Sequence, residues 1–207
     1  MDNIIKFYQN KAQVPTLLLH SCCAPCSSYV LEYLSTCFKI TLFYYNPNIY
    51  PQNEYLFRLN ELKNFIKDFT TRVLIKDFPL NTHHIGLIIG EYDYKKFFSI
   101  SKGLELQSEG EQRCINCYKL RLRETAKVAN LLKFDYFTTT LSISPHKDSN
   151  VLNCLGEEIA KNYNVKYLYS DFKKKDGFKR SLQLSREYGL YRQNYCGCIY
   201  SLNNCEK

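Results

Sequence analysis

Seven of the ten cysteines in this 207-residue chain fall into three short motifs. The motifs are Cys22-Cys23-x-x-Cys26, Cys114-x-x-Cys117 and Cys196-x-Cys198. Cysteine thiolates act as nucleophiles, redox groups and ligands of soft metal ions, so this grouping predicts redox or metal chemistry. The remaining cysteines stand alone, and we expect them to be small buried apolar side chains: Cys37, Cys154 and Cys205.

The spacing of the motifs leaves three kinds of site open. Cys23-Ala-Pro-Cys26, between an expected strand and an expected helix, is typical of a thiol–disulfide site, because a helix N-terminus stabilises a thiolate. A tetrahedral zinc site needs only four ligands, fewer than the grouped cysteines offer. An iron–sulfur cluster presents several irons, so adjacent Cys22 and Cys23 can each bind one. We favour iron–sulfur, with zinc and a disulfide relay as alternatives.

The charge distribution indicates the kind of partner, and the search for targeting signals indicates the cellular compartment. The formal net charge is +8, and residues 161–192 carry nine Lys or Arg against three Asp or Glu. This clustering favours an anionic partner such as RNA over an evenly basic surface. We find neither a signal-peptide pattern nor an apolar run that could cross a membrane, so we expect a cytoplasmic protein. Thiols are kept reduced there, which favours metal or redox cysteines over structural disulfides.

The pattern of apolar residues predicts a single α/β domain over residues 1–207, with a mostly parallel sheet and helices on both faces. The expected strands are 16–20, 39–46, 72–78, 136–142 and 165–170. The expected helices are 26–36, 53–69, 93–101, 114–132, 149–163 and 178–188. Ligands of such sheets bind beyond the carboxyl ends of the strands. Cys22 follows the first strand and Lys147 follows the fourth, so both are expected at that edge.

Five stretches, in this order, resemble the QueH-type epoxyqueuosine reductase family. They are LLHSCCAPC (18–26), YNPNIYPQNEYLFR (45–58), RCINCYKLRL (113–122), FTTTLSISPHKD (137–148) and DFKKKDGFKRSLQLSREYGLYRQNYCGCIYS (171–201). The resemblance implies the last step of queuosine biosynthesis, in which the epoxide of a modified guanine at the tRNA wobble position is reduced to an alkene. Two electrons and two protons are consumed and water is released. It also implies a Rossmann-like fold of the HUP or ATP-pyrophosphatase kind. The segment SCCAPCSS replaces the ATP-binding S-G-G-x-D-S loop, so we expect no ATP chemistry.

The same resemblance implies a [4Fe–4S] cluster, with one further iron beside it. Its implied ligands are Cys22, Cys23, Cys114 and Cys117. Cys196 and Cys198 then form either a redox-active pair or ligands of the second iron. Cys26 stands where some members of the family have Asp, and a carboxylate can bind iron but cannot form a disulfide. This favours a metal-binding role for Cys26.

Further residues receive expected roles from the reaction that the resemblance implies. A proton donor must turn the epoxide oxygen into water, and the candidates are Asp171, Tyr191 and His20, although His20 is equally well explained as a satisfied residue at a strand end. Tyr191 and Tyr195 are candidates to stack on the target base, and Arg58 either orients a neighbour or contacts substrate. The expected tRNA phosphate contacts are Lys147, Lys173, Lys174, Lys175, Lys179, Arg180 and Arg192. The reaction type predicts a ferredoxin or flavodoxin as electron donor.

Anaerobic purification followed by an absorption spectrum and metal analysis separates these hypotheses. We expect four irons with matching sulfide for each chain, and a fifth iron if the second metal site is filled. A thiol–disulfide oxidoreductase using Cys23 and Cys26 would be colourless and free of metal. A zinc-bound RNA-binding module would contain stoichiometric zinc and show no redox activity. Either of these results would contradict the iron–sulfur prediction.

Overall fold

The structure is a computed structural model and describes residues 14–75 and 84–205. Its centre is a five-stranded parallel sheet in the order β3-β2-β1-β4-β5. The strands are β1 (Thr16–His20), β2 (Lys39–Tyr44), β3 (Gly86–Ile89), β4 (Tyr136–Thr139) and β5 (Lys166–Tyr167). This strand order is typical of a doubly wound α/β sheet. Strands β2 and β3 lie on one side of β1, and β4 and β5 lie on the other, so the topological switch point falls between β1 and β4. The predicted Rossmann-like α/β fold is therefore confirmed.

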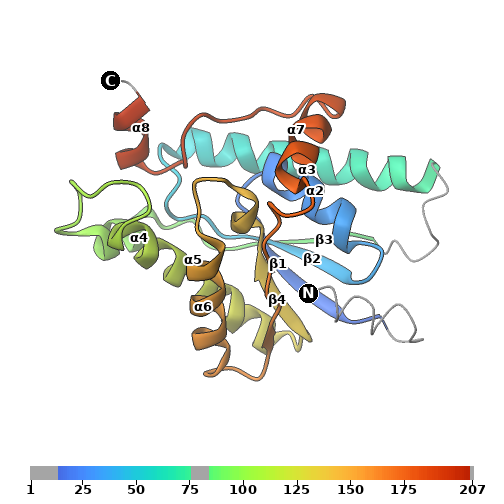
Figure 1. Cartoon of the computed structure of the whole chain (residues 1–207), viewed down its shortest axis with the longest axis horizontal. Coiled ribbons are helices and arrows are strands. Elements are labelled where there is room, and N and C mark those ends of the chain that lie inside the picture. Colours follow the sequence, from blue (N-terminus) through green and yellow to red (C-terminus); the bar gives the residue numbers. More distant parts are fainter. Residues whose placement is uncertain (1–13, 76–83, 206–207) are drawn as a thin grey trace.

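Helices cover both faces of this sheet (Figure 1). Helices α2, α3 and α7 pack on one face, and α5 and α6 pack together on the other, with α4 against α5. Their bounds are α2 (Ala24–Leu34), α3 (Gln52–Ile75), α4 (Tyr94–Ser101), α5 (Gln112–Leu131), α6 (Ser149–Ala160), α7 (Gly177–Glu187) and α8 (Ile199–Cys205), with a 3₁₀ helix η1 (Thr140–Ile143) after β4. Within the part of the chain that the structure describes, no helix combines the length and the apolar character that a membrane span requires.

Strand β1 is buried on both faces, which explains its uninterrupted apolar sequence. Leu17 and Leu19 belong to the cluster of side chains under α2 and α3, whereas Leu18 belongs to the cluster under α5 and α6. All three leucines are fully buried. Successive side chains of a strand point to opposite faces, so a central parallel strand must be apolar at every position.

The predicted strand at 72–78 is wrong for the residues described there, because Arg72–Ile75 is the last turn of α3. Residues 76–78 lie outside the described part of the chain. The Arg72 guanidinium lies 4.1 Å from the centre of the Tyr188 ring, and its Nη2 donates to the Glu187 carbonyl. These contacts with the end of α7 stabilise the helix, although the sequence RVLI favours a strand locally. The third strand is instead β3, which the sequence patterns did not identify.

Three other predicted strands are shorter than expected, and β2 ends at Tyr44, two residues before its predicted end. Strand β4 ends at Thr139, and the next residues form η1 because the Thr139 Oγ1 accepts a hydrogen bond from the Leu141 amide and caps that turn. Strand β5 spans only Lys166–Tyr167 of the predicted 165–170. The early end of β4 brings Thr140 beside Cys22, whose amide lies 3.4 Å from the Thr140 hydroxyl. The shortened strand thus helps to shape the carboxyl edge of the sheet.

Helix α6 packs on β5 through a glycine, which gives a test of the fold. A Cβ atom added at Gly156 would overlap the Tyr167 ring. We expect Gly156→Ala to lower the free energy of unfolding by about 1–3 kcal/mol, although alanine favours helix more than glycine. Urea denaturation measures the change. Cys154→Ala at an exposed position of the same helix is the control, and equal stability of the two variants would contradict this packing.

Candidate active site

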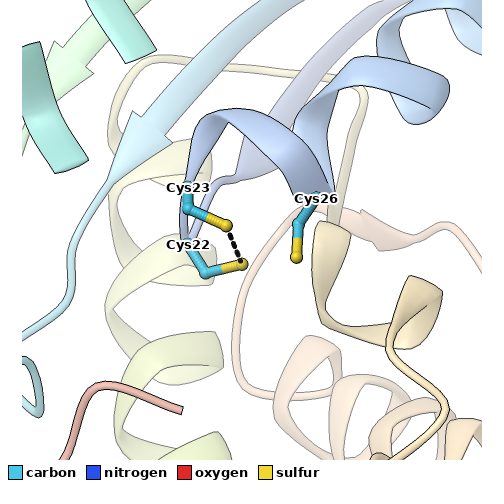
Figure 2. Close-up of side chains that lie close together, drawn as sticks. All are labelled: Cys22, Cys23 and Cys26. Atoms are coloured by element: carbon cyan, nitrogen blue, oxygen red, sulfur yellow. Dashed lines mark hydrogen bonds between the residues drawn. The ribbon is translucent and has the colours of Figure 1, made fainter. Parts of the chain in front are cut away.

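Cys22, Cys23 and Cys26 gather where β1 ends and α2 begins (Figure 2). Cys23 is the N-cap of α2, and the sulfur of Cys26, one turn later, faces the other two. The three sulfur atoms lie within 4.8 Å of one another, and those of Cys22 and Cys23 are 3.7 Å apart. Tetrahedral ligation with metal–sulfur bonds of about 2.3 Å places sulfurs about 3.8 Å apart. The group therefore fits the ligation of a metal.

Hydrogen bonds among the three thiols favour ionisation of Cys22 over the other two. Hydrogen bonds from Cys23 and Cys26 hold the pKa of Cys22 well below its ordinary value, against the opposing effect of burial. The hydrogen bond with Cys22 raises the pKa of Cys23 to about 12 and also raises the pKa of Cys26. Metal binding requires deprotonated sulfurs, so a cation bound here would displace the protons that the sulfurs carry.

The other two cysteine motifs lie beside this group. Cys114 and Cys117 occupy the first turns of α5, and Cys117 packs with Cys198 and Phe97 in a small buried cluster. Cys196 interacts electrostatically with both Cys114 and Cys117, and it lines the same cavity as Cys22. The three motifs therefore approach one another at the carboxyl edge of the sheet. Among the described residues, however, the three sulfurs within 4.8 Å are those of Cys22, Cys23 and Cys26, without Cys114 or Cys117.

None of the nine described cysteines whose side chains are placed is in a disulfide. The expected pair Cys196 and Cys198 is thus present as two free thiols, and burial raises the pKa of Cys198 to about 12. Of the isolated cysteines, Cys37 is buried as expected, whereas Cys154 is exposed on α6, so the expectation was wrong there. The side chain of Cys205 lies outside the described part.

Three buried cations surround the sulfurs. Arg58 is 1% exposed, Arg121 is 2% exposed and Lys147 is 8% exposed. Arg121 donates from Nε to His20 and from Nη2 to the Asn46 Oδ1 at 2.6 Å. Burial alone would lower the pKa of Arg121, but nearby Cys117, Cys22 and Cys196 outweigh it and the pKa is raised. The cations therefore stay charged, and they make the surroundings of the thiolates electropositive.

A cavity of about 370 Å³ opens beside the cysteine group. This volume is at the lower end of the range for small-molecule sites. The wall combines sulfur, cations, polar groups and the rings of Phe178 and Tyr195. Its polar members include Cys22, Cys26, Cys196, Arg58, Arg121, Lys147, Arg192, Glu109, Gln193, Ser144 and His146.

The expected proton donors are not among the residues lining this cavity. Asp171 is half-buried and its Oδ1 lies 3.2 Å from the Lys173 Nζ, and Tyr191 is exposed with its ring against Phe57. Burial and the charge of Arg121 lower the pKa of His20 from 6.5 to about 3, so this side chain is neutral. Its Nε2 accepts from Arg121, and we assign the proton to Nδ1, facing the Thr139 hydroxyl. His20 is therefore a satisfied residue at the strand end.

The expected phosphate contacts have very different surroundings. Lys147 is buried, with its Nζ 3.8 Å from Glu109, and Lys173 donates to the carbonyls of Ser142 and Lys147. Arg180 forms ion pairs with Glu32 and Glu187. Arg192 is exposed and lines the cavity. Lys174, Lys175 and Lys179 are exposed around the start of α7.

Arg121, Glu109 and Gln193 line the cavity but were not identified from the sequence. For Arg121 a signal was available, because it lies four positions after Cys117 and therefore on the same face of α5. Glu109 and Gln193 lie outside regular helices and strands, and no spacing rule points to them.

Comparison with known proteins shows which family the chain belongs to. A family model described as epoxyqueuosine reductase QueH matches residues 17–204. The chain belongs to this QueH family. The resemblance to this family found in the five sequence stretches is thereby confirmed, and so is the enzyme class, because the relatives are named as reductases.

The QueH relatives match over most of their length. The epoxyqueuosine reductase QueH of Streptococcus pyogenes serotype M1 is 39% identical over 201 residues, which cover 97% of this chain and 76% of the relative. That of Staphylococcus epidermidis is 39% identical over 203 residues, covering 97% and 82%. That of Thermotoga maritima is 34% identical over 193 residues, covering 90% of both chains.

The neutral state of His20 predicts an acid-sensitive fold. Its folded pKa of about 3 is below the unfolded value of 6.5, so the unfolded chain gains a proton first as pH falls. The stabilisation is complete above pH 6.5 and decreases as pH falls towards 3. Between pH 7.5 and 5, wild type should lose about 2 kcal/mol more unfolding free energy than His20→Gln.

Urea denaturation at the two pH values measures this difference. His84→Gln changes an exposed histidine and should lose stability in parallel with wild type. If His20→Gln also follows wild type, His20 is not the group that titrates.

Proposed function

We propose that this QueH chain reduces epoxyqueuosine at the wobble position of tRNA to queuosine. The observation that carries the proposal is the match to reductases of that name over 97% of the chain, together with a cavity whose wall contains Cys22, Cys26 and Cys196. The reaction removes the epoxide oxygen and leaves an alkene, using two electrons and two protons and releasing water. A one-electron carrier such as a ferredoxin or flavodoxin is the electron donor that this stoichiometry favours.

The cysteines fit the proposed iron centre in donor chemistry and in charge. Thiolates are the usual ligands of iron–sulfur clusters, and the buried Arg58, Arg121 and Lys147 offset the negative charge that such a centre brings. We propose Cys22, Cys23, Cys114 and Cys117 as ligands of a [4Fe–4S] cluster. Cys26, Cys196 and Cys198 remain for one further iron. When bound, these groups supply electrons one at a time and a Lewis acid for the departing oxygen.

The residues of the chain position the base and control charge around it. The cavity accepts one base, with Tyr195 and Phe178 as the aromatic surfaces in its wall. Cys196, Tyr118 and Glu109 raise the pKa of Lys147 despite its burial, so Nζ keeps its proton and presents a fixed positive charge. Asp171 and Tyr191 remain the proposed proton donors, which requires that they reach the base through movement or through water.

The tRNA backbone binds at the mouth of the cavity in this proposal. Arg192 is the cation best placed for a phosphate, because it is both exposed and part of the cavity wall. Lys174, Lys175 and Lys179 continue the positive surface around α7. Lys173, Arg180 and Lys147 already form ion pairs with carboxylates of the protein, so we assign them a weaker share of the phosphate contacts.

Conversion of epoxyqueuosine-containing tRNA, followed by nucleoside mass spectrometry, tests the function. We expect the anaerobic holoprotein with a strong reductant to form queuosine. Cys22→Ser should lower the rate by about a hundredfold or more and reduce the bound iron, because it removes a ligand. Cys154→Ser, at an exposed lone cysteine, should match wild type. An iron-loaded wild-type protein that forms no queuosine would refute the assignment.

A further inference from the structure

Two buried polar atoms in the cavity wall have no partner within the protein. Among the buried side-chain nitrogen and oxygen atoms of the described residues, those lacking a hydrogen bond include Arg58 Nη2 and Gln193 Oε1. Both residues line the cavity. Buried polar groups are nearly always hydrogen-bonded, so two unpaired atoms in one cavity wall point to a ligand that completes them.

Arg58 is fixed in place by its other contacts. Its Nε donates to Glu54 Oε1 at 2.7 Å, and its Nη1 donates to the Cys196 carbonyl at 3.4 Å. The guanidinium lies 5.1 Å from the centre of the Tyr195 ring. Since the two bonded nitrogens and the ring hold the planar group, the free Nη2 cannot turn away to find another acceptor.

Both unpaired atoms also lie near the sulfurs. The Gln193 Nε2 donates to Cys23 Sγ at 3.0 Å, which leaves the amide oxygen of that side chain free. Arg58 interacts electrostatically with the same Cys23. The free donor and the free acceptor therefore belong to two residues that line the cavity and both interact with Cys23.

Hydrogen-bonding capacity defines the ligand. A guanidinium only donates, whereas a glutamine amide oxygen only accepts. The matching ligand is a small polar ring that carries an acceptor oxygen and, elsewhere on the ring or its linker, an O–H or N–H. An epoxide oxygen has lone pairs and no hydrogen, so of the two unpaired atoms only Arg58 Nη2 can bind it.

We propose that Arg58 Nη2 donates a hydrogen bond to the epoxide oxygen, while Gln193 Oε1 accepts from an O–H or N–H that substrate and product share. The proposal rests on the proposed function. Negative charge grows on the oxygen as its carbon–oxygen bonds break, and a preorganised buried donor stabilises that charge. Two electrons from the one-electron carrier and two protons complete the loss of water, while Arg58 keeps its own proton. Because the product lacks this oxygen, it loses the bond and is released more easily.

Binding of two tRNAs to the oxidised holoprotein tests the proposal without turnover. We expect wild type to bind tRNA carrying epoxyqueuosine about tenfold more tightly than tRNA carrying queuosine, as a bond to a charged donor allows. Arg58→Met should bring the ratio of the two dissociation constants to about one, and Arg58→Lys should keep part of the preference. Arg72→Met changes another arginine of α3, outside the cavity, and should preserve the wild-type ratio.

The remaining outcomes are also decisive. Gln193→Leu should weaken binding of both tRNAs equally and leave the ratio of the two dissociation constants unchanged. This variant provides a second test if Arg58→Met does not fold. A wild-type ratio of about one overturns the proposal, and so does a wild-type ratio in Arg58→Met or loss of the ratio in Gln193→Leu. If wild type forms queuosine but shows no preference, only this inference fails. If wild type forms no queuosine, the proposed function itself fails.

Discussion

The constraint on which this site depends is the burial of positive charge next to sulfur. Taking a charged group out of water costs several kcal/mol unless a partner offsets it. Glu54 and Glu109 offset Arg58 and Lys147, but the hydrogen-bond partners of Arg121 are the neutral His20 and Asn46. The groups that raise the pKa of Arg121 against its burial are Cys117, Cys22 and Cys196. The cysteines and the cations stabilise each other. The surrounding strands and helices shield these side chains from water.

Much of the fold could be predicted because local pattern and tertiary position agree. The apolar run of β1 fits a central strand, and the helical spacing of 114–132 fits α5. The prediction failed where distant contacts decide, as at Arg72, whose partners on Glu187 and Tyr188 lie more than a hundred positions away. Strand β3 was missed because its four residues, GLII, are too few to show a period.

The sequence predicted those parts of the candidate site whose chemistry follows from residue type alone. Grouped cysteines identified the family, and their places after strands indicated the edge where they meet. The sequence did not predict which long charged side chains are buried, because Arg, Lys and Glu usually lie at the surface. Lys147 was therefore expected on a phosphate, whereas its ammonium lies inside the cavity wall. The unpaired atoms of Arg58 and Gln193 could not be predicted from the sequence, because the lack of a hydrogen-bond partner is visible only in the three-dimensional structure.

The hydrogen bond between Gln193 and Cys23 joins residues 170 positions apart. During translation, Cys23 leaves the ribosome long before the segment that closes over it has been made. The nascent chain thus presents Cys22, Cys23 and Cys26 without the segment that covers them, and the wall of the cavity is complete only once Ser201 has been made. In the proposed function, the metal centre can therefore be enclosed only after Gln193 and Cys196 have been synthesised, and Cys22, Cys23 and Cys26 stay uncovered until then.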